Sequence, residues 1–179
     1  MASGGKRNLV EGLVFAGTMG LVALVLVLLG MLADSRRSAF ERDALYALAK
    51  RPLSGKAAER GSPELPRIYR LPSRGKTSFG LVLPLRDSKE ASLAAAVLAA
   101  DGELEAIRLL GSSPASREEG GTAWLQSLVG SGGSTPYPSS KEEAKNADAV
   151  SGSTESFLAA AASLERASAA VRLVAKERP

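Results

Sequence analysis

Small polar residues fill the segment 148–156, directly before an apolar-periodic stretch that we expect to be the last helix of the chain. Ser151, Ser153 and Thr154 carry hydroxyl groups, and Gly152 lets another group approach the backbone closely. The N-terminus of a helix presents unpaired N–H groups and the positive end of the helix dipole. Together these features suit the binding of a phosphate group. An ordinary Ser/Thr helix cap has the same composition, so the residues alone leave both interpretations open.

The composition limits the chemistry that side chains could perform. The chain has no His and no Cys, which excludes disulfides, thiolate nucleophiles, zinc sites of the His/Cys type, Cys-ligated iron–sulfur clusters and a Ser-His-Asp triad. Chemistry carried by an organic cofactor remains possible. We expect no catalytic side chain and no metal site. With only 4% aromatic residues, a stacking platform for nucleic acid is not expected either.

The segment from Asp148 to Thr154 resembles the Asp-x-x-Ser/Thr-Gly-Ala-Thr motif of the FMN-binding domain family. Asp148, Ser151, Gly152 and Thr154 match the motif, and Ser153 replaces the usual Ala with another small residue. The family includes the G subunit of Rnf-type ion-translocating electron-transport complexes and the C subunit of sodium-translocating NADH:quinone oxidoreductases. In these subunits a flavin transferase moves FMN from FAD to the threonine hydroxyl and forms a phosphoester. The resemblance therefore implies FMN covalently bound to Thr154.

The resemblance extends to the organisation of the chain. Members of the family have one N-terminal membrane anchor and one small domain, and their strands resemble residues 77–85 and the Asp101-Gly102 hairpin. The family's Glu-Thr-Pro-Gly loop should fall within residues 111–121, where this chain has Glu118-Glu119-Gly120-Gly121. Glu155-Ser156 stands where the family often has Ile-Thr-Ser. These departures leave a second hypothesis, in which the chain is a flavin-free membrane-anchored scaffold or binding module of the same fold.

An uncharged apolar run extends from Gly12 to Ala33. A helix of this length, at about 1.5 Å per residue, is long enough to cross the hydrocarbon core of a bilayer. Leu and Val occupy every face of it, and a domain this small could not bury such a helix. A cleaved signal peptide is the main alternative, but residues 31–33 lack the small residue expected three positions before a cleavage site. We predict an uncleaved transmembrane anchor at 12–33 that follows an N-terminal tail at 1–11.

Charge and family resemblance point to opposite orientations of the anchor. Arg36, Arg37 and Arg42 after the run outnumber Lys6 and Arg7 before it, so the positive-inside count favours a cytoplasmic domain, although the rule weakens when a whole domain follows the helix. The resemblance implies a single-pass protein of the cell inner membrane with its domain on the extracytoplasmic side. It also implies an electron-carrier subunit rather than a stand-alone enzyme. Its partners would be membrane subunits of an electron-transport complex and, during maturation, a flavin transferase.

The remainder divides into a basic stem and linker at 34–66 and an α+β FMN-binding domain at 67–179. The stem begins with a helix-like stretch at 34–50, which ends before Pro52. In the domain, alternating apolar residues predict strands at 67–71, 77–85, 92–100 and 103–110. The Ala-rich stretch 91–100 has helical propensity, but the Asp-Gly turn that follows it favours a strand.

The other predicted elements complete the domain. Pro84 inside its strand indicates an edge or a bulge. Polar loops are expected at 111–121 and 130–138, with a short helix at 123–129 between them. Apolar residues spaced by three and four predict an amphipathic final helix from Glu155 to Lys176, and the charges at both of its ends suit the helix dipole.

Overall fold

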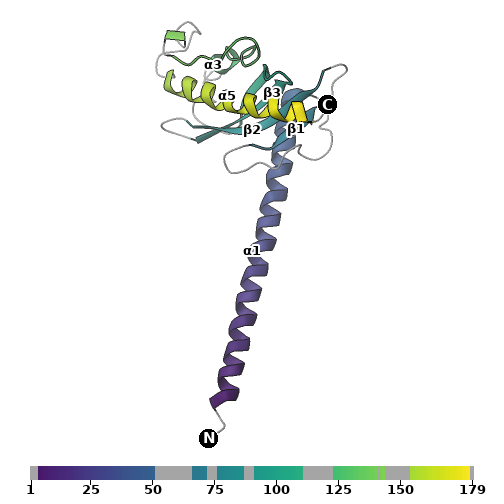
Figure 1. Ribbon diagram of the computed structural model, residues 1–179, viewed down its shortest axis with the longest axis vertical. Coiled ribbons are helices and arrows are strands. Elements are labelled where there is room, and N and C mark those ends of the chain that lie inside the picture. Colours follow the sequence, from purple (N-terminus) through teal and green to yellow (C-terminus); the bar gives the residue numbers. More distant parts are fainter. Residues whose placement is uncertain are drawn as a thin grey trace. The chain divides into compact units, whose positions relative to one another are not determined.

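The computed structural model describes residues 4–50, 66–71, 76–86, 91–110, 123–140, 142–143 and 154–177. The chain divides into two compact units, Met1–Phe40 and Glu41–Pro179. The described part of the first unit, from Gly4 onward, is helical. The second contains an antiparallel sheet with helical segments on both of its faces (Figure 1). The predicted α+β layout is therefore confirmed.

Helix α1 extends without a break from Gly4 to Ala49. It includes both the predicted apolar run and the helix-like stretch after it. The large apolar side chains between Phe15 and Leu32 are exposed, and the helix is long and apolar enough to cross a membrane. Lys50 ends it with a φ of 51° and a 2.8 Å hydrogen bond from its N–H to the Tyr46 carbonyl. The last helical residue, Ala49, is one residue before the end of the helix-like stretch predicted at 34–50.

Four strands form one sheet in the order β1-β2-β3-β4, and each neighbouring pair is antiparallel. Their bounds are Ile68–Leu71 for β1, Ser78–Arg86 for β2, Ala91–Ala99 for β3 and Leu104–Leu110 for β4. The predicted hairpin between β3 and β4 is confirmed. The Ala99 N–H bonds to the Glu103 carbonyl at 2.8 Å, and Gly102 has a φ of 87°, which glycine adopts without strain.

The Ala-rich segment is a central strand rather than a helix. Its small side chains alternate between the two faces of the sheet: Ala94 and Ala96 belong to the main core, and Ala95 belongs to a second core on the opposite face. Such small side chains let elements on both faces pack close to the strand. Strand pairing and burial thus override the helical propensity of alanine.

Pro84 lies where β2 has only one described neighbour. It pairs with Leu93 of β3, whereas the register of β1 with β2 reaches only from Ser78 to Leu81. A proline is tolerated there because its missing N–H interrupts no pairing with β1. The register shift in the sheet lies elsewhere, between Val97 and Leu98.

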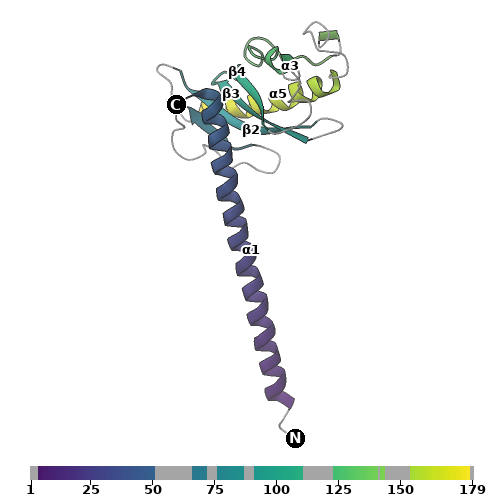
Figure 2. The same cartoon turned by 180° about the vertical axis from the view of Figure 1, so that it is seen from behind.

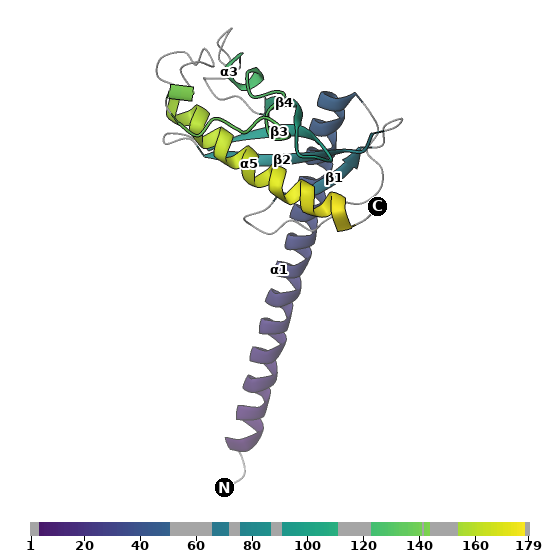
Figure 3. The ribbon, with the colours of Figure 1, turned by 45° about the horizontal axis from the view of Figure 1, so that its top comes forward.

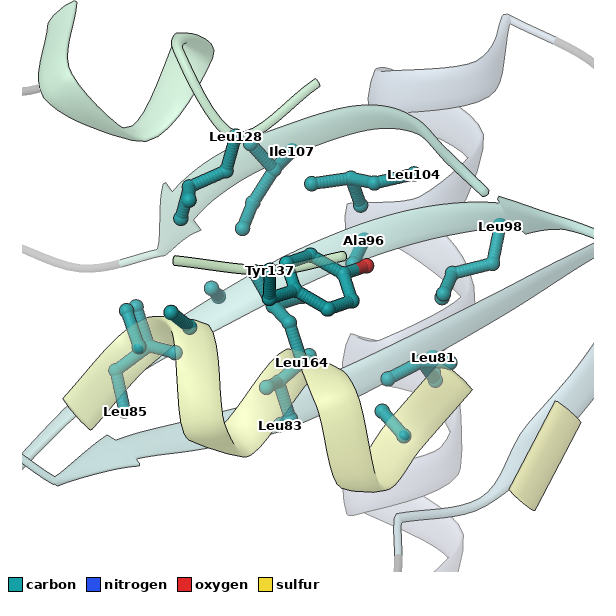
Figure 4. Packing of buried hydrophobic residues seen from close by; sticks show 14 of the residues in the cluster. Leu81, Leu83, Leu85, Ala96, Leu98, Leu104, Ile107, Leu128, Tyr137 and Leu164 are labelled. Carbon is teal, nitrogen blue, oxygen red and sulfur yellow. The ribbon is translucent and has the colours of Figure 1, made fainter. Parts of the chain in front are cut away.

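The final helix, α5, extends from Thr154 to Glu177 and covers one face of the sheet (Figure 1). The prediction placed its start one residue later. The main core lies between α5 and the sheet (Figure 4). Its largest fully buried members are Phe79, Leu81, Leu98, Leu104, Ile107, Leu125, Leu128, Phe157, Leu164 and Val171.

The last turns of α1, from Glu41 to Ala49, cover the other face, as Figure 2 shows from behind. Leu45 packs there with Tyr69, Val82 and Ala95. A side chain at Gly80 would meet both terminal carbons of Leu45 at 3.0–3.1 Å, so this glycine provides the space that Leu45 fills. Part of the predicted stem therefore belongs to the folded unit.

A buried hydrogen bond joins the last turns of α1 to strand β1. The Tyr69 hydroxyl donates to Glu41 Oε2 at 2.8 Å, and both residues are 2% exposed. Burial, followed by the hydrogen bond to Glu41 and its charge, raises the pKa of Tyr69 to about 12, while Arg67 acts in the opposite direction. The phenol therefore stays protonated as the donor of this bond.

Candidate functional site

Thr154 is the first residue of helix α5. The first four N–H groups of a helix have no partner within the helix, and the helix dipole places partial positive charge at the same end. As predicted from the sequence, Thr154 therefore lies at the N-terminus of a helix. The other four predicted site residues, Asp148, Ser151, Gly152 and Ser153, lie outside the described residues.

The first turn of α5 is held by an aromatic contact. Phe157 lies three residues after Thr154 and is fully buried. Its ring meets that of Trp124 edge to face, with ring centroids 5.9 Å apart and an interplanar angle of 61°. Aromatic pairs in this geometry contribute about 0.5–1.5 kcal/mol beyond the area that they bury. The N-terminus of α5 is thereby fixed beside the segment that carries Trp124.

That segment is helix α3, Ala123–Gln126, which Figure 3 shows beside the first turns of α5. Two contacts attach it to the sheet. Gln126 Nε2 donates to the Ile107 carbonyl at 2.9 Å, and Leu125 and Leu128 are fully buried. Because α3 is attached to the sheet, the partly buried Trp124 has a fixed position. The sequence predicted this short helix but did not indicate that its tryptophan would reach the start of α5.

The chain after α3 continues along the edge of β4. The Gly130 N–H bonds to the Leu104 carbonyl at 2.9 Å, and the Leu104 N–H bonds to the Ser131 carbonyl at 2.8 Å. A few residues later the Tyr137 ring enters the main core, where Figure 4 shows it among Leu104, Leu164 and Ala96. The predicted loop at 130–138 is irregular in structure, yet it protects part of a sheet edge and contributes to the core.

A polar junction fixes α5 further along its length. The Ser168 hydroxyl donates to the Gly102 carbonyl in the β3–β4 turn, and both residues are buried. A side chain at Gly132 would meet the Tyr137 hydroxyl at 2.6 Å and Ser168 Oγ at 2.8 Å. The loop at 130–138 therefore packs against the β3–β4 turn and α5 so closely that no side chain fits at Gly132. Since this junction and the aromatic contact are eleven residues apart on α5, the helix is held at two points.

The groups at this helix end are compatible with a phosphoester. Thr154 supplies a secondary hydroxyl, and the first turn of α5 supplies N–H donors for an anion. Within the part of the chain that the structure describes, no group of three or more acidic residues is placed to hold a metal ion. The threonine and the helix end thus have the chemistry that a covalently bound phosphate requires.

Comparisons with models of protein families, with curated proteins and with solved structures found no match to this chain. The loop at 111–121, where the resemblance would place the family's Glu-Thr-Pro-Gly loop, lies outside the described residues. What can be proposed about function therefore rests on the motif that ends at Thr154 and on the geometry around the start of α5.

Proposed function

We propose that this chain is a membrane-anchored electron-transfer subunit that carries FMN covalently on Thr154. It would belong to an Rnf-type complex that couples electron transfer to ion translocation. The observation that carries the proposal is the coincidence of two facts. Thr154 is the terminal residue of the Asp-x-x-Ser-Gly-small-Thr motif, and it is also the first residue of α5.

The residues around Thr154 would hold the phosphate of the cofactor. A phosphodiester keeps one negative charge, which a helix N-terminus stabilises by about 0.3–1 kcal/mol. The hydroxyls of Ser151 and Ser153 are potential donors to the phosphate oxygens, and Gly152 lets the backbone approach them. Asp148 completes the motif. These four residues give the sequence context in which a flavin transferase would recognise the threonine.

The attachment would be a phosphoryl transfer, in which one P–O bond forms and another breaks. The Thr154 oxygen forms a bond to the flavin-side phosphorus of FAD, and the pyrophosphate P–O bond breaks. AMP leaves, and the proton of the threonine hydroxyl is released with it. No oxidant or reductant is needed. Because the transferase supplies the catalytic groups, this chain supplies only the nucleophilic hydroxyl and its surroundings.

When bound, FMN supplies one- and two-electron chemistry. The protein's part is to hold the cofactor and to shape its environment. The partly exposed Trp124, held by the buried Phe157 one helical turn from the attachment point, provides an apolar ring there. The covalent bond retains the cofactor at any concentration of free flavin. No side chain of this chain is required to act as a general acid or base.

The proposal includes a location. Helix α1 is long and apolar enough to cross a membrane, and we place it in the cell inner membrane with the domain on the extracytoplasmic side. There the domain would exchange electrons with the membrane subunits of the complex. This orientation follows the family resemblance rather than the distribution of basic residues around the apolar run.

The test is a mass spectrum of the peptide that contains Thr154. The full chain is produced in cells that contain the flavin transferase and purified in detergent. The peptide should carry the mass of one FMN less one water, and the yellow colour should survive denaturation. Thr154→Ala should abolish both signals, whereas Thr135→Ala, at an exposed loop threonine, should leave both unchanged. Intact wild-type protein without flavin would refute the proposal and favour the flavin-free scaffold.

A further inference from the structure

Two arginines and a phenylalanine follow the apolar part of α1 within the first unit. Arg36, Arg37 and Phe40 are exposed, Phe40 by 49%. The helix is continuous here, so Arg36 and Arg37 lie about 4.5 and 6 Å beyond Ala33 along its axis. The polar layer of a bilayer adds about 5–8 Å on each side of the hydrocarbon core. If the run that ends at Ala33 fills that core, both arginines lie at the level of the lipid headgroups.

The direction of helical side chains brings the three residues together. Every Cα–Cβ bond of an α-helix tilts toward the N-terminus, which in α1 is the direction of the apolar run. Phe40 follows Arg36 by four residues and Arg37 by three, the spacings at which helical side chains are neighbours. The Phe40 ring therefore extends back toward the turn that carries the two arginines.

The chemistry of this group matches that of a phospholipid. A guanidinium presents its N–H donors in a planar fork that fits phosphate oxygens in pairs. An aromatic ring beside it is suited to the interfacial layer of headgroups. Residues 34–40 contain two arginines and one acidic residue, Asp34, so the segment carries a net positive charge and is attracted to an anionic surface.

We propose that Arg36, Arg37 and Phe40 form a binding site for the headgroups of anionic phospholipids. The inference rests on α1 spanning a membrane and is independent of flavin. The two arginines hold the lipid phosphate, and the Phe40 ring lies beside them among the headgroups. The site thus enriches anionic lipids around the anchor where it leaves the hydrocarbon core.

Another role for the two arginines predicts a different result. If they only set the orientation of the anchor during insertion, they show no preference among lipids in a preformed bilayer. A measurement on the purified chain in vesicles of known composition therefore separates the lipid site from this role.

The test places a fluorescent probe at Phe40. The full-length Phe40→Trp variant is made in a Trp124→Phe background, because Trp124 is the one native tryptophan. It is reconstituted into vesicles of phosphatidylcholine and phosphatidylglycerol in which one lipid or the other carries a spin label near the top of an acyl chain, within quenching range of the headgroups. At equal mole fractions, spin-labelled phosphatidylglycerol should quench the emission about twofold more than spin-labelled phosphatidylcholine, and high salt should reduce the difference.

The arginines provide the matched controls. The double change Arg36→Gln with Arg37→Gln should make quenching by the two lipids equal, whereas Arg108→Gln, at an exposed position of β4, should preserve the preference. If Trp124→Phe impairs folding, as judged by circular dichroism, Phe40→Trp is measured with Trp124 present and the wild-type emission is subtracted. Equal quenching with both arginines in place, or no quenching by either lipid, would overturn the proposal.

Discussion

The backbone of Gly132 packs directly against the carbonyl group of Gly102, with no room for a side chain between them. The same carbonyl accepts the hydrogen bond from Ser168 of α5. Gly132 has a φ of 101°, a conformation that other residues adopt only with strain. The β3–β4 turn, the loop at 130–138 and α5 thus pack together at one place. The turn and the loop each contribute a glycine there, Gly102 and Gly132.

Replacing Gly132 with alanine should therefore destabilise the domain strongly. We expect a loss of about 2–5 kcal/mol in the free energy of unfolding, because backbone strain and steric overlap add together. Gly130→Ala is the matched control: its φ is 90°, but a methyl group there meets no atom within 4 Å, so only strain of about 1–2 kcal/mol applies. Denaturant unfolding of the full chain in detergent, followed by Trp124 emission, measures both. Equal losses would contradict the crowding at Gly132.

A substitution at Tyr137 should have the opposite effect and stabilise the domain. Its side chain is 7% exposed, and its hydroxyl makes no hydrogen bond of normal geometry with the described residues, although Ser168 lies close enough to act against the rise in its pKa. Burial raises the pKa of this phenol, so it remains protonated and its polar group remains a cost of folding. Tyr137→Phe should increase the free energy of unfolding by about 1 kcal/mol, whereas Tyr46→Phe at an exposed position should change nothing. A clear loss of stability in Tyr137→Phe would mean that the hydroxyl has a partner.

Local patterns predicted the elements of the domain closely. Apolar alternation identified the strands, and the Asp-Gly turn decided that the Ala-rich segment is a strand. The Ser/Thr-rich segment before an apolar-periodic stretch placed the start of α5 within one residue of Thr154. Each of these signals depends on neighbours a few residues apart, and such patterns can be recognised in a single sequence.

Contacts between distant residues could not be predicted in this way. Tyr137 stands between two prolines in a segment without periodicity, so nothing indicated that its ring enters the core. The bond between Glu41 and Tyr69 joins positions 28 residues apart. The contact of Trp124 with Phe157 likewise depends on the folded arrangement. The candidate site was therefore predictable at its attachment point, but not in the aromatic contact beside it.

The bond between Tyr69 and Glu41 makes stability depend on pH in the alkaline range. The pKa of Tyr69 rises from 10.0 to about 12 on folding, so the folded state retains a proton that the unfolded state releases. The stabilisation is complete below pH 10 and is lost as the pH rises toward 12. The free energy of unfolding should fall more steeply over this interval in wild type than in Tyr69→Phe. Parallel pH profiles of the two proteins would contradict this coupling.

The contact of Trp124 with Phe157 gives an optical test of where a flavin on Thr154 would lie. Flavins absorb in the range in which tryptophan emits, so a flavin near the start of α5 should quench Trp124. In the full chain, emission should be lower and its lifetime shorter in flavinylated wild type than in Thr154→Ala, which keeps Trp124 but cannot carry FMN. Thr135→Ala should match the wild type. Because Trp124 is the one tryptophan, the change reports a single position. Unchanged emission in protein that mass spectrometry shows to be flavinylated would place the flavin away from α3 and leave Trp124 a purely structural role.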